Sequence, residues 1–330
     1  MRLSAPFILA PMAGVTDLPF RLIAREFGCR LAFTEMVNAR ALAFENRQTL
    51  DLLRSAPQDS PLGVQLLGRD PEFLIRAVET LAGYPYDVID LNAACPVHKV
   101  TKKGEGAALM REPATLSRLV RALVSCSPVP VTVKIRSGWD QASVNAPEIA
   151  RAIADAGADA VCVHGRTRKQ GYGGRADMGV IRAVKEAVGI PVIASGDVFS
   201  VDAALQTLEA TGCDAVMVAR GALGNPWIFR DLAAACEDGR APSEVFEAAG
   251  RDGEEAPVGR PHARSKEEVK AVMARHLRLS VAHHGAAKGV IDFRKSFIWY
   301  SRGLPNARAL RPKAVRVTGV EEMLALIGEL

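Results

Sequence analysis

The sequence predicts an α/β protein, a (β/α)8 TIM barrel followed by a small C-terminal helical domain. Eight short runs rich in apolar and β-branched residues recur between residues 7 and 221, and a segment with helical punctuation follows most of them. The runs are apolar almost throughout, as in strands that are buried on both faces of a parallel sheet. Eight strand–helix units in about 220 residues agree with the size of such a barrel.

The predicted strands follow one another at regular intervals. They cover residues 7–14, 31–36, 62–68, 88–94, 131–138, 160–166, 191–197 and 215–221. A doubly wound sheet is the alternative, and the regular units with no visible break in strand order favour the barrel. Between the strands, Asp70 followed by Pro71 predicts a helix start, and Ser200 and Gly212 predict the start and end of another helix.

The chain divides into three predicted parts. Residues 1–235 form the barrel, and residues 236–264 are rich in Gly, Pro, Glu and Arg without periodicity, as in a linker or a surface excursion. Residues 265–330 return to a helical pattern, which opens with Ser265 and Glu268 at the spacing of a capping box. We expect this last part to be a separate helical domain.

Composition and cysteine spacing exclude several classes of protein. The 330 residues are 48% hydrophobic and 24% charged, as in a globular protein. The longest apolar runs reach only strand length and the N-terminus lacks a signal-peptide pattern, so we expect a cytoplasmic protein without a membrane span. The six cysteines are scattered without a C-x-x-C pair, so neither a structural zinc site nor a disulfide framework is expected, and no metal is predicted.

Charge is distributed unevenly along the chain. The net charge is +5, but residues 265–316 hold twelve Lys and Arg against three Asp and Glu. Residues 237–255, just before them, hold seven acidic residues against two basic ones. A basic block on a mildly basic chain indicates a polyanionic partner.

Unusual polar residues stand in or just after the predicted strands, where barrels of this class carry their active sites. Gln65 and Lys134 interrupt apolar strands, and a buried lysine is costly unless it is paired or faces an anion. A salt bridge across the barrel mouth is one explanation, and an anionic or polarisable ring is the other. After the last two strands, Gly196, Arg220 and Gly221 provide backbone N–H groups and a guanidinium at the usual phosphate position. This combination predicts a phosphorylated cofactor.

The sequence lacks the motifs of several other enzyme classes. The stretch GEGAAL at 104–109 has two of the three glycines of a dinucleotide fingerprint and lies too far from its strand. No Walker A motif, H-E-x-x-H or G-x-S-x-G elbow occurs in the sequence.

Six ordered stretches carry a family resemblance. They are LAPMAGVTDLPFR, LNAACPVHKVTKKGEGAAL, VKIRSGWD, HGRTRKQGYGG, SGDV and VMVARGALGNPWIF. In this order they resemble the motifs of bacterial tRNA-dihydrouridine synthases, most closely the B-type branch. The likeness is dense over about residues 3–230 and returns weakly at FRKSFIWYSRGLP. Ala94, Ser195 and Ser296 depart from the family's usual residues.

The resemblance implies a flavin enzyme that modifies RNA. In this family NADPH, or alternatively NADH, reduces FMN, and the flavin passes hydride to C6 of a uridine in tRNA while a cysteine protonates C5. Cys95 matches that proton donor, and Asn92 matches a substrate-contacting asparagine. The positions that match cofactor contacts are Pro11, Met12, Ala13, Gln65, Lys134, His164, Ser195, Gly196, Asp197, Ala219 and Arg220. We expect a monomer.

The predicted RNA contacts lie in the active-site loops and in the helical domain. Besides Asn92 they are Lys99, Arg136, Arg166, Arg294, Lys295 and Arg302. Trp299 and Tyr300 lie between Lys295 and Arg302, and we expect both aromatic side chains to pack in the core of the helical domain. A flavin barrel that reduces a free pyrimidine or enone metabolite is the alternative function, and the basic helical domain argues against it. A non-catalytic RNA-binding protein is a third hypothesis, which the presence of Cys95 and Lys134 disfavours.

Cys95 poses a specific problem. His98, Lys99, Lys102 and Lys103 follow it closely, and nearby cations lower the pKa of a thiol. An acid that protonates C5 has to remain protonated until it reacts. We therefore expect these cations to point away from the sulfur and toward RNA phosphates.

Overall fold

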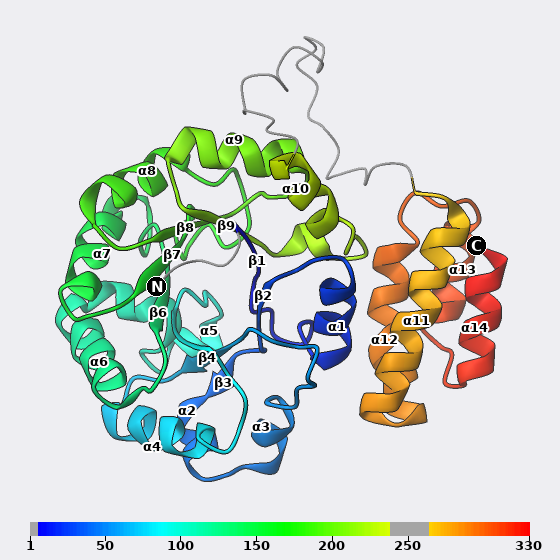
Figure 1. Cartoon of the computed structure of the whole chain (residues 1–330), viewed down its shortest axis with the longest axis horizontal. Coiled ribbons are helices and arrows are strands. Elements are labelled where there is room, and N and C mark those ends of the chain that lie inside the picture. Colours follow the sequence, from blue (N-terminus) through cyan, green and yellow to red (C-terminus); the bar gives the residue numbers. More distant parts are fainter. Residues whose placement is uncertain (1–5, 238–263) are drawn as a thin grey trace.

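The computed structural model describes residues 6–237 and 264–330 and contains a closed barrel of parallel strands (Figure 1). The barrel strands are β1 (Phe7–Leu9), β2 (Leu31–Phe33), β4 (Leu62–Leu67), β5 (Val88–Ala93), β6 (Val131–Arg136), β7 (Ala160–His164), β8 (Val192–Ser195) and β9 (Ala215–Val218). Each pairs in parallel with its neighbours, and the β1–β9 and β2–β4 pairings close the ring. The short strand β3 (Val37–Asn38) adds to β4. The predicted barrel is confirmed.

Helices surround the strands on the outside (Figure 1). They are α1 (Leu18–Glu26), α2 (Ala39–Ala43), α3 (Arg47–Asp51), α4 (Pro71–Leu81), α6 (Pro113–Cys126), α7 (Ala146–Ala154), α8 (Met178–Ala187), α9 (Val201–Thr211) and α10 (Ile228–Glu237). The short helix α5 (His98–Thr101) follows β5 and lies inside this ring in Figure 1, and the 3-10 turns are η1 (Gly106–Arg111), η2 (Gln141–Ser143) and η3 (Arg220–Ala222). The predicted caps are present: Asp70 accepts from the Glu72 N–H at 3.0 Å, and Ser200 accepts from the Ala203 N–H at 3.1 Å.

Successive residues of a barrel strand face opposite sides. In β1, Ile8 points into the barrel, whereas Phe7 and Leu9 pack with the surrounding helices. The interior is filled by Phe33, Cys162, Met217 and other buried apolar side chains. An added Cβ at Gly63 would lie 2.3 Å from the Phe33 ring, so this glycine makes room for the largest interior side chain. The interior is a packed core and not a pore.

The C-terminal residues form four helices that stand beside α1 (Figure 1). They are α11 (Lys266–His284), α12 (Ala286–Tyr300), α13 (Ala307–Ala314) and α14 (Val320–Glu329). These helices have their own apolar core, which Trp227 from the barrel side joins. Ser265 caps α11 as predicted, but the Glu268 carboxylate accepts from Trp227 Nε1 at 2.6 Å, so only the serine half of the expected capping box is observed. Tyr300 is buried, as expected.

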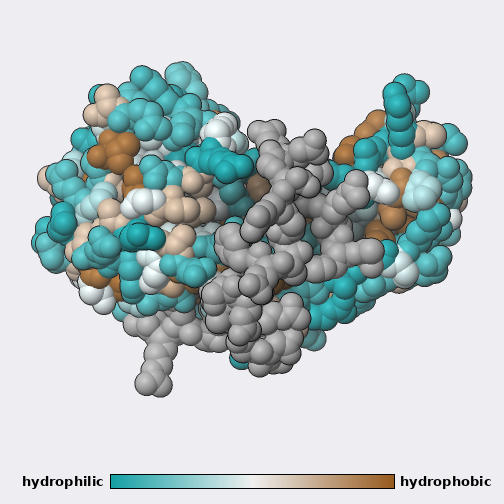
Figure 2. All heavy atoms as spheres, turned by 90° about the horizontal axis from the view of Figure 1, so that it is seen from above, coloured by the Kyte–Doolittle hydropathy of each residue, from teal (hydrophilic) through white to brown (hydrophobic). Residues whose placement is uncertain are grey.

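The predicted linker, residues 236–264, lies almost wholly outside the described residues. Figure 2 shows the barrel and the helical part as two lobes with mostly hydrophilic surfaces. Within the described ranges, no helix is both long and apolar enough to span a membrane.

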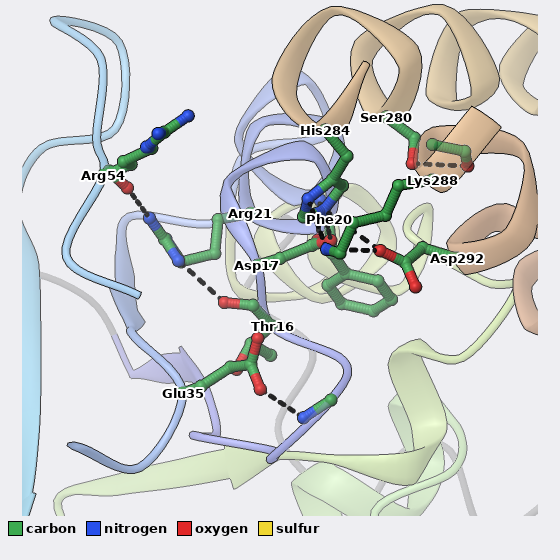
Figure 3. A network of polar contacts seen from close by, with 12 residues as sticks. Thr16, Asp17, Phe20, Arg21, Glu35, Arg54, Ser280, His284, Lys288 and Asp292 are labelled. Atoms are coloured by element: carbon green, nitrogen blue, oxygen red, sulfur yellow. Dashed lines mark hydrogen bonds and ion pairs between the residues drawn. The ribbon is translucent and has the colours of Figure 1, made fainter. Parts of the chain in front are cut away.

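A polar network joins the two lobes around the start of α1 (Figure 3). Asp17 caps α1 by accepting from the Phe20 N–H at 3.0 Å, and the same carboxylate lies 2.9 Å from Nε2 of His284. Lys288 donates to Nδ1 of His284 at 3.0 Å and to Asp292 at 2.9 Å. Because Nδ1 accepts from the ammonium group, Nε2 carries the proton that is shared with Asp17.

Candidate active site

A cavity of about 570 Å³ opens at the carboxyl ends of the barrel strands. All residues predicted to contact the cofactor line it, together with Asn92, Cys95 and Arg136. Ala10, Pro11, Met12, Ala13 and Met217 form an apolar side near β1 and β9, and polar side chains from β4 to β9 form another side. Val97, Val100, Val198, Phe199 and Leu223 add further apolar surface. The barrel therefore gathers residues that lie up to about 200 positions apart in the sequence.

A chain of buried amides orients the polar side of the cavity. Asn92 Nδ2 donates to Gln65 Oε1 at 2.7 Å, and Gln65 Nε2 donates to the carboxylate of Asp90 at 2.7 Å. Thr132 donates to the other Asp90 oxygen at 2.7 Å. Burial raises the pKa of Asp90 to about 6, while the bonds from Thr132 and Gln65 act against this rise. Asp90 thus fixes Gln65 from below, and Gln65 fixes Asn92.

Asn92 in turn holds the backbone that carries Cys95. Its Oδ1 accepts from the Ala94 N–H at 3.0 Å and from the Cys95 N–H at 2.8 Å. The Cys95 carbonyl accepts from the Ala107 N–H at 3.0 Å. Gly106 has φ +59°, and an added Cβ there would lie 2.9 Å from the Cys95 oxygen. The cysteine is therefore held from its own strand end and from the following loop.

The thiol of Cys95 is half-buried and stays protonated at neutral pH. Burial raises the pKa of Cys95 above its ordinary value, although the Val97 N–H and Arg136 lower it in part. The cation that acts on the thiol is thus Arg136 and not one of the following lysines. Lys99 is exposed, and Lys102 and Lys103 line a separate cavity.

Arg136 is buried, with 2% of its surface exposed, and ties three segments together. Its Nε donates to the Ala94 carbonyl at 2.7 Å, and one terminal nitrogen donates to the carbonyls of Thr167 and Gly171 at 3.0 and 2.9 Å. Burial lowers the pKa of Arg136 to about 10, so it remains charged at neutral pH. A fixed positive charge therefore lies beside Cys95.

Lys134 and His164 lie on the polar side of the cavity. The Lys134 ammonium makes one long hydrogen bond, 3.5 Å to the Ser195 hydroxyl, and no ion pair with a described residue. A salt bridge across the barrel mouth is therefore not its role among these residues. Burial, together with the charges of Lys134, Arg136, Arg166 and Arg220, lowers the pKa of His164 to about 2, so His164 is neutral.

The loops after β8 and β9 form the cationic end of the cavity. Asp197 pairs with the buried Arg166 at 2.8 Å and with Arg220 at 3.4 Å, and it accepts from the Ala176 N–H at 2.8 Å. Burial would raise the pKa of Asp197, but Arg166, Ala176 and Arg220 hold it below the ordinary value. An added Cβ at Gly221 would lie 2.1 Å from the Val198 carbonyl, so the two loops can pack this closely only with glycine there.

Five predicted RNA contacts lie outside the cavity lining. Lys99 and Arg302 are exposed, and Arg166 is buried against Asp197. Arg294 donates twice to the Val317 carbonyl at 2.9 and 2.6 Å, and Lys295 donates to the Gly14 carbonyl at 2.5 Å. Arg166, Arg294 and Lys295 therefore have structural partners inside the molecule.

Sequence reasoning missed several residues at the site. Tyr172 lines the cavity with 61% of its surface exposed, and the guanidinium of Arg220 lies 4.9 Å from its ring. It stands in the glycine-rich stretch after β7, which was its only signal. Met36 and Phe199, also in the lining, gave none. Asp90 interrupts an apolar strand just as Gln65 does, so the same argument could have found it.

No cluster of His, Cys, Asp or Glu that could hold a metal ion occurs in the described ranges 6–237 and 264–330. The scattered cysteines are free within these ranges, and Cys162 is buried inside the barrel as expected.

Comparison with known proteins extends these observations to the whole chain. The family model described as dihydrouridine synthase (Dus) matches residues 8–329. A protein of Synechocystis sp. named probable tRNA-dihydrouridine synthase 1 is 36% identical over 324 residues, which cover 98% of this chain and 85% of the relative. The tRNA-dihydrouridine synthase B of Pseudomonas aeruginosa is 37% identical over 320 residues, 97% of this chain and 91% of the relative. The motif resemblance is confirmed, and the chain belongs to the dihydrouridine synthase family.

Proposed function

We propose that this protein reduces the C5–C6 double bond of a uridine in cytoplasmic tRNA, with FMN as its flavin and NADPH as the source of electrons. The names of its relatives support tRNA as the substrate class. The observation that carries the proposal is Cys95, whose half-buried, protonated thiol faces a cavity that also holds the Lys134 ammonium group. The alternative substrate, a free pyrimidine, has no specific observation in its favour.

The residues of the cavity fit a flavin mononucleotide. A volume of about 570 Å³ lies within the range of cofactor sites, and the apolar side with Pro11, Met12 and Ala13 suits a planar ring. Lys134 has donors to spare, because its one hydrogen bond to a described residue, the Ser195 hydroxyl, is 3.5 Å long. Arg220 and the glycine-containing loops suit a phosphate at the far end. Bound FMN would supply hydride to C6 of the base.

The side chains around the ring have separate roles in this proposal. Lys134 would donate to the part of the ring that becomes negative on reduction, and Gln65, held by Asp90, would donate its remaining N–H. Arg220 would bind the phosphate while Asp197 holds its guanidinium in place. His164 is neutral, so it can accept or donate a hydrogen bond without repelling Lys134.

Cys95 would complete the reaction as the general acid. Addition of hydride at C6 leaves negative charge at C5 and O4, and the thiol gives its proton to C5. The thiolate that remains lies beside Arg136, whose positive charge stabilises it until a proton from solvent restores the thiol. His164, with a pKa of about 2, is not an imidazolium at neutral pH and so cannot serve as the acid in place of Cys95. Asn92, which holds the Cys95 backbone, would also contact the base.

The direct experiment is reduction of unmodified tRNA by the purified protein with FMN and NADPH. Dihydrouridine is mapped by mass spectrometry of tRNA fragments, in parallel with free uridine and uracil as substrates. We expect product in tRNA at specific positions. Product from the free compounds alone would favour the metabolite reductase, and no product from any of the three would contradict the proposal.

A further inference from the structure

A second cavity, of about 410 Å³, lies beside the candidate active site and is strongly cationic. Its lining consists of Arg69, Thr101, Lys102, Lys103, Gly104, Ala108, Arg111 and Glu112. The cations come from three segments: the loop after β4, the residues after α5, and the end of η1. They converge only in the folded chain, so neither Arg69 nor Arg111 could be assigned this role from local sequence.

The charges in this second cavity do not cancel. The Glu112 carboxylate already has two partners: Arg69 lies 3.1 Å from it, and the Thr115 hydroxyl donates to it at 3.1 Å. It therefore neutralises only one of the cations. Burial raises the pKa of the neighbouring Glu105 carboxyl, while Lys103 and Arg69 lower it in part. Lys102, Lys103 and Arg111 have no ion-pair partner among the described residues. A net positive charge is left to attract an anion.

The short helix α5 separates the two cavities. Val97 and Val100 line the active-site cavity, whereas Thr101 and the residues up to Gly104 line the second one. A helix is about 10 Å across, so a molecule that reaches both sites must span roughly that distance. A nucleic-acid strand can do so with its base in one cavity and a backbone phosphate in the other.

The lining suits a phosphate better than a ring. Ala108 is its only apolar side chain, so no wall is available for stacking a base or a nicotinamide. Gly104 has φ +75°, and an added Cβ would lie 1.9 Å from a terminal nitrogen of Arg69. Because Gly104 has no side chain, the Arg69 guanidinium has room to reach the cavity.

We infer that this second cavity binds a backbone phosphate of the tRNA strand that carries the reduced uridine. The inference rests on the proposed function and adds to it a contact outside the basic helices. Phosphate contacts position a nucleic acid without reading its sequence. Binding here would seat the strand across α5, directly beside Cys95.

The test compares Lys102→Ala/Lys103→Ala with the charge-matched control Arg121→Ala/Arg151→Ala. The control arginines are exposed on α6 and α7 and line neither of the two cavities. The affinity for unmodified tRNA is measured at several salt concentrations. For the lysine variant we expect a Kd on the order of ten-fold higher near physiological salt and a slope of log Kd against log salt lower by about 0.7, the value for one lost phosphate contact. Lys102→Arg/Lys103→Arg should keep both values near those of the wild type.

Equal affinities of the lysine variant and the control would overturn the inference. So would a loss of NADPH affinity with unchanged tRNA affinity, because the cavity would then serve a nicotinamide nucleotide. These outcomes differ from failure of the proposed function, in which the wild-type protein itself neither binds nor reduces tRNA. Failure of the wild-type protein to bind and reduce tRNA would contradict both the proposed function and the phosphate-binding inference.

Discussion

Lys295 of α12 donates a hydrogen bond from Nζ to the backbone carbonyl of Gly14, 2.5 Å away. The N–H of the same glycine donates to the carboxylate of Glu35, which Figure 3 shows beside the start of α1. Gly14 has φ +70° and directly follows Ala13 in the cavity wall. Both backbone groups of one residue are thus held by side chains, one from each lobe. The helical lobe therefore contributes to the position of the wall against which a flavin would lie.

Replacing Lys295 by methionine should weaken FMN binding. The variant loses a charge-assisted hydrogen bond to the Gly14 carbonyl, and we expect flavin affinity to fall on the order of ten-fold. Flavin fluorescence titration in the absence of tRNA measures this. Lys266→Met, at the exposed start of α11, is the matched control, and Lys295→Arg should recover part of the affinity. Unchanged flavin affinity in Lys295→Met would show that the helical lobe does not set the wall.

Cys95→Ala should lose dihydrouridine formation by at least about 100-fold, because a general acid contributes 10²–10⁴-fold to rate. Single-turnover reduction of tRNA by the pre-reduced enzyme isolates this step. Cys126→Ala removes another half-buried thiol and should react at the wild-type rate. The raised pKa of Cys95 also sets the direction of the pH dependence. Because the protonated thiol is the active form, the wild-type rate should be level around neutral pH and fall in alkaline solution. A rate that rises with pH would identify a base instead.

Arg136→Lys should destabilise the protein even though it conserves the charge. Lysine cannot reproduce the planar geometry that reaches the carbonyls of Ala94, Thr167 and Gly171, and these groups would lose their donors in a buried site. We expect a loss of about 2–4 kcal/mol in the free energy of unfolding. Urea denaturation measures it, with Arg121→Lys on the surface as the control. A loss below about 0.5 kcal/mol would contradict the packing role of this guanidinium.

Lowering the pH should decrease the free energy of unfolding, in part because His276 of the helical lobe is buried in its neutral form. This histidine is 4% exposed, and its Nδ1 lies 3.2 Å from the Tyr300 hydroxyl. Burial lowers the pKa of His276 from 6.5 to about 4, so below pH 6.5 the unfolded chain binds a proton that the folded chain excludes. Going from pH 7 to pH 5 should therefore cost about 2 kcal/mol from this group.

His276→Phe tests this contribution. His164 and His283, whose pKa values are also lowered, act in the same direction, so the variant should retain part of the pH dependence. The measured quantity is the difference between the free energies of unfolding at the two pH values, in the wild type and in the variant. An equal difference in both proteins would assign the acid sensitivity to other groups.

Much of the barrel follows from the sequence alone, because buried parallel strands have a clear apolar pattern. The predicted strands extend too far at their carboxyl ends: the first was expected over residues 7–14, and the strand is Phe7–Leu9. The excess residues, such as Pro11 and Met12, remain apolar because they line the cavity, so the pattern does not show where the strand stops.

The cavity-lining residues were predictable where they stand at strand ends, since the barrel itself brings those ends together. The partner of Lys295 was not, because Gly14 lies 281 positions away and nothing local marks the contact. The basic context of Lys295 predicted a phosphate, and only the packing of α12 beside the first loop reveals a carbonyl. Tyr172 was missed for a similar reason, as its place depends on the loop that Arg136 holds.

The packed barrel interior also bears on the order of events in catalysis. Ile8, Phe33, Cys162 and Met217 pack the barrel interior beneath the cavity, so the cavity is reached from the carboxyl ends of the strands. In the proposed function, the nicotinamide and the uridine would both approach the flavin ring from this end of the barrel, and we expect binding of one to exclude the other. Turnover should accordingly alternate between two half-reactions, with oxidised nucleotide leaving before RNA enters. Initial rates at varied NADPH and tRNA should give parallel double-reciprocal lines, and an excess of either reactant should compete with the other.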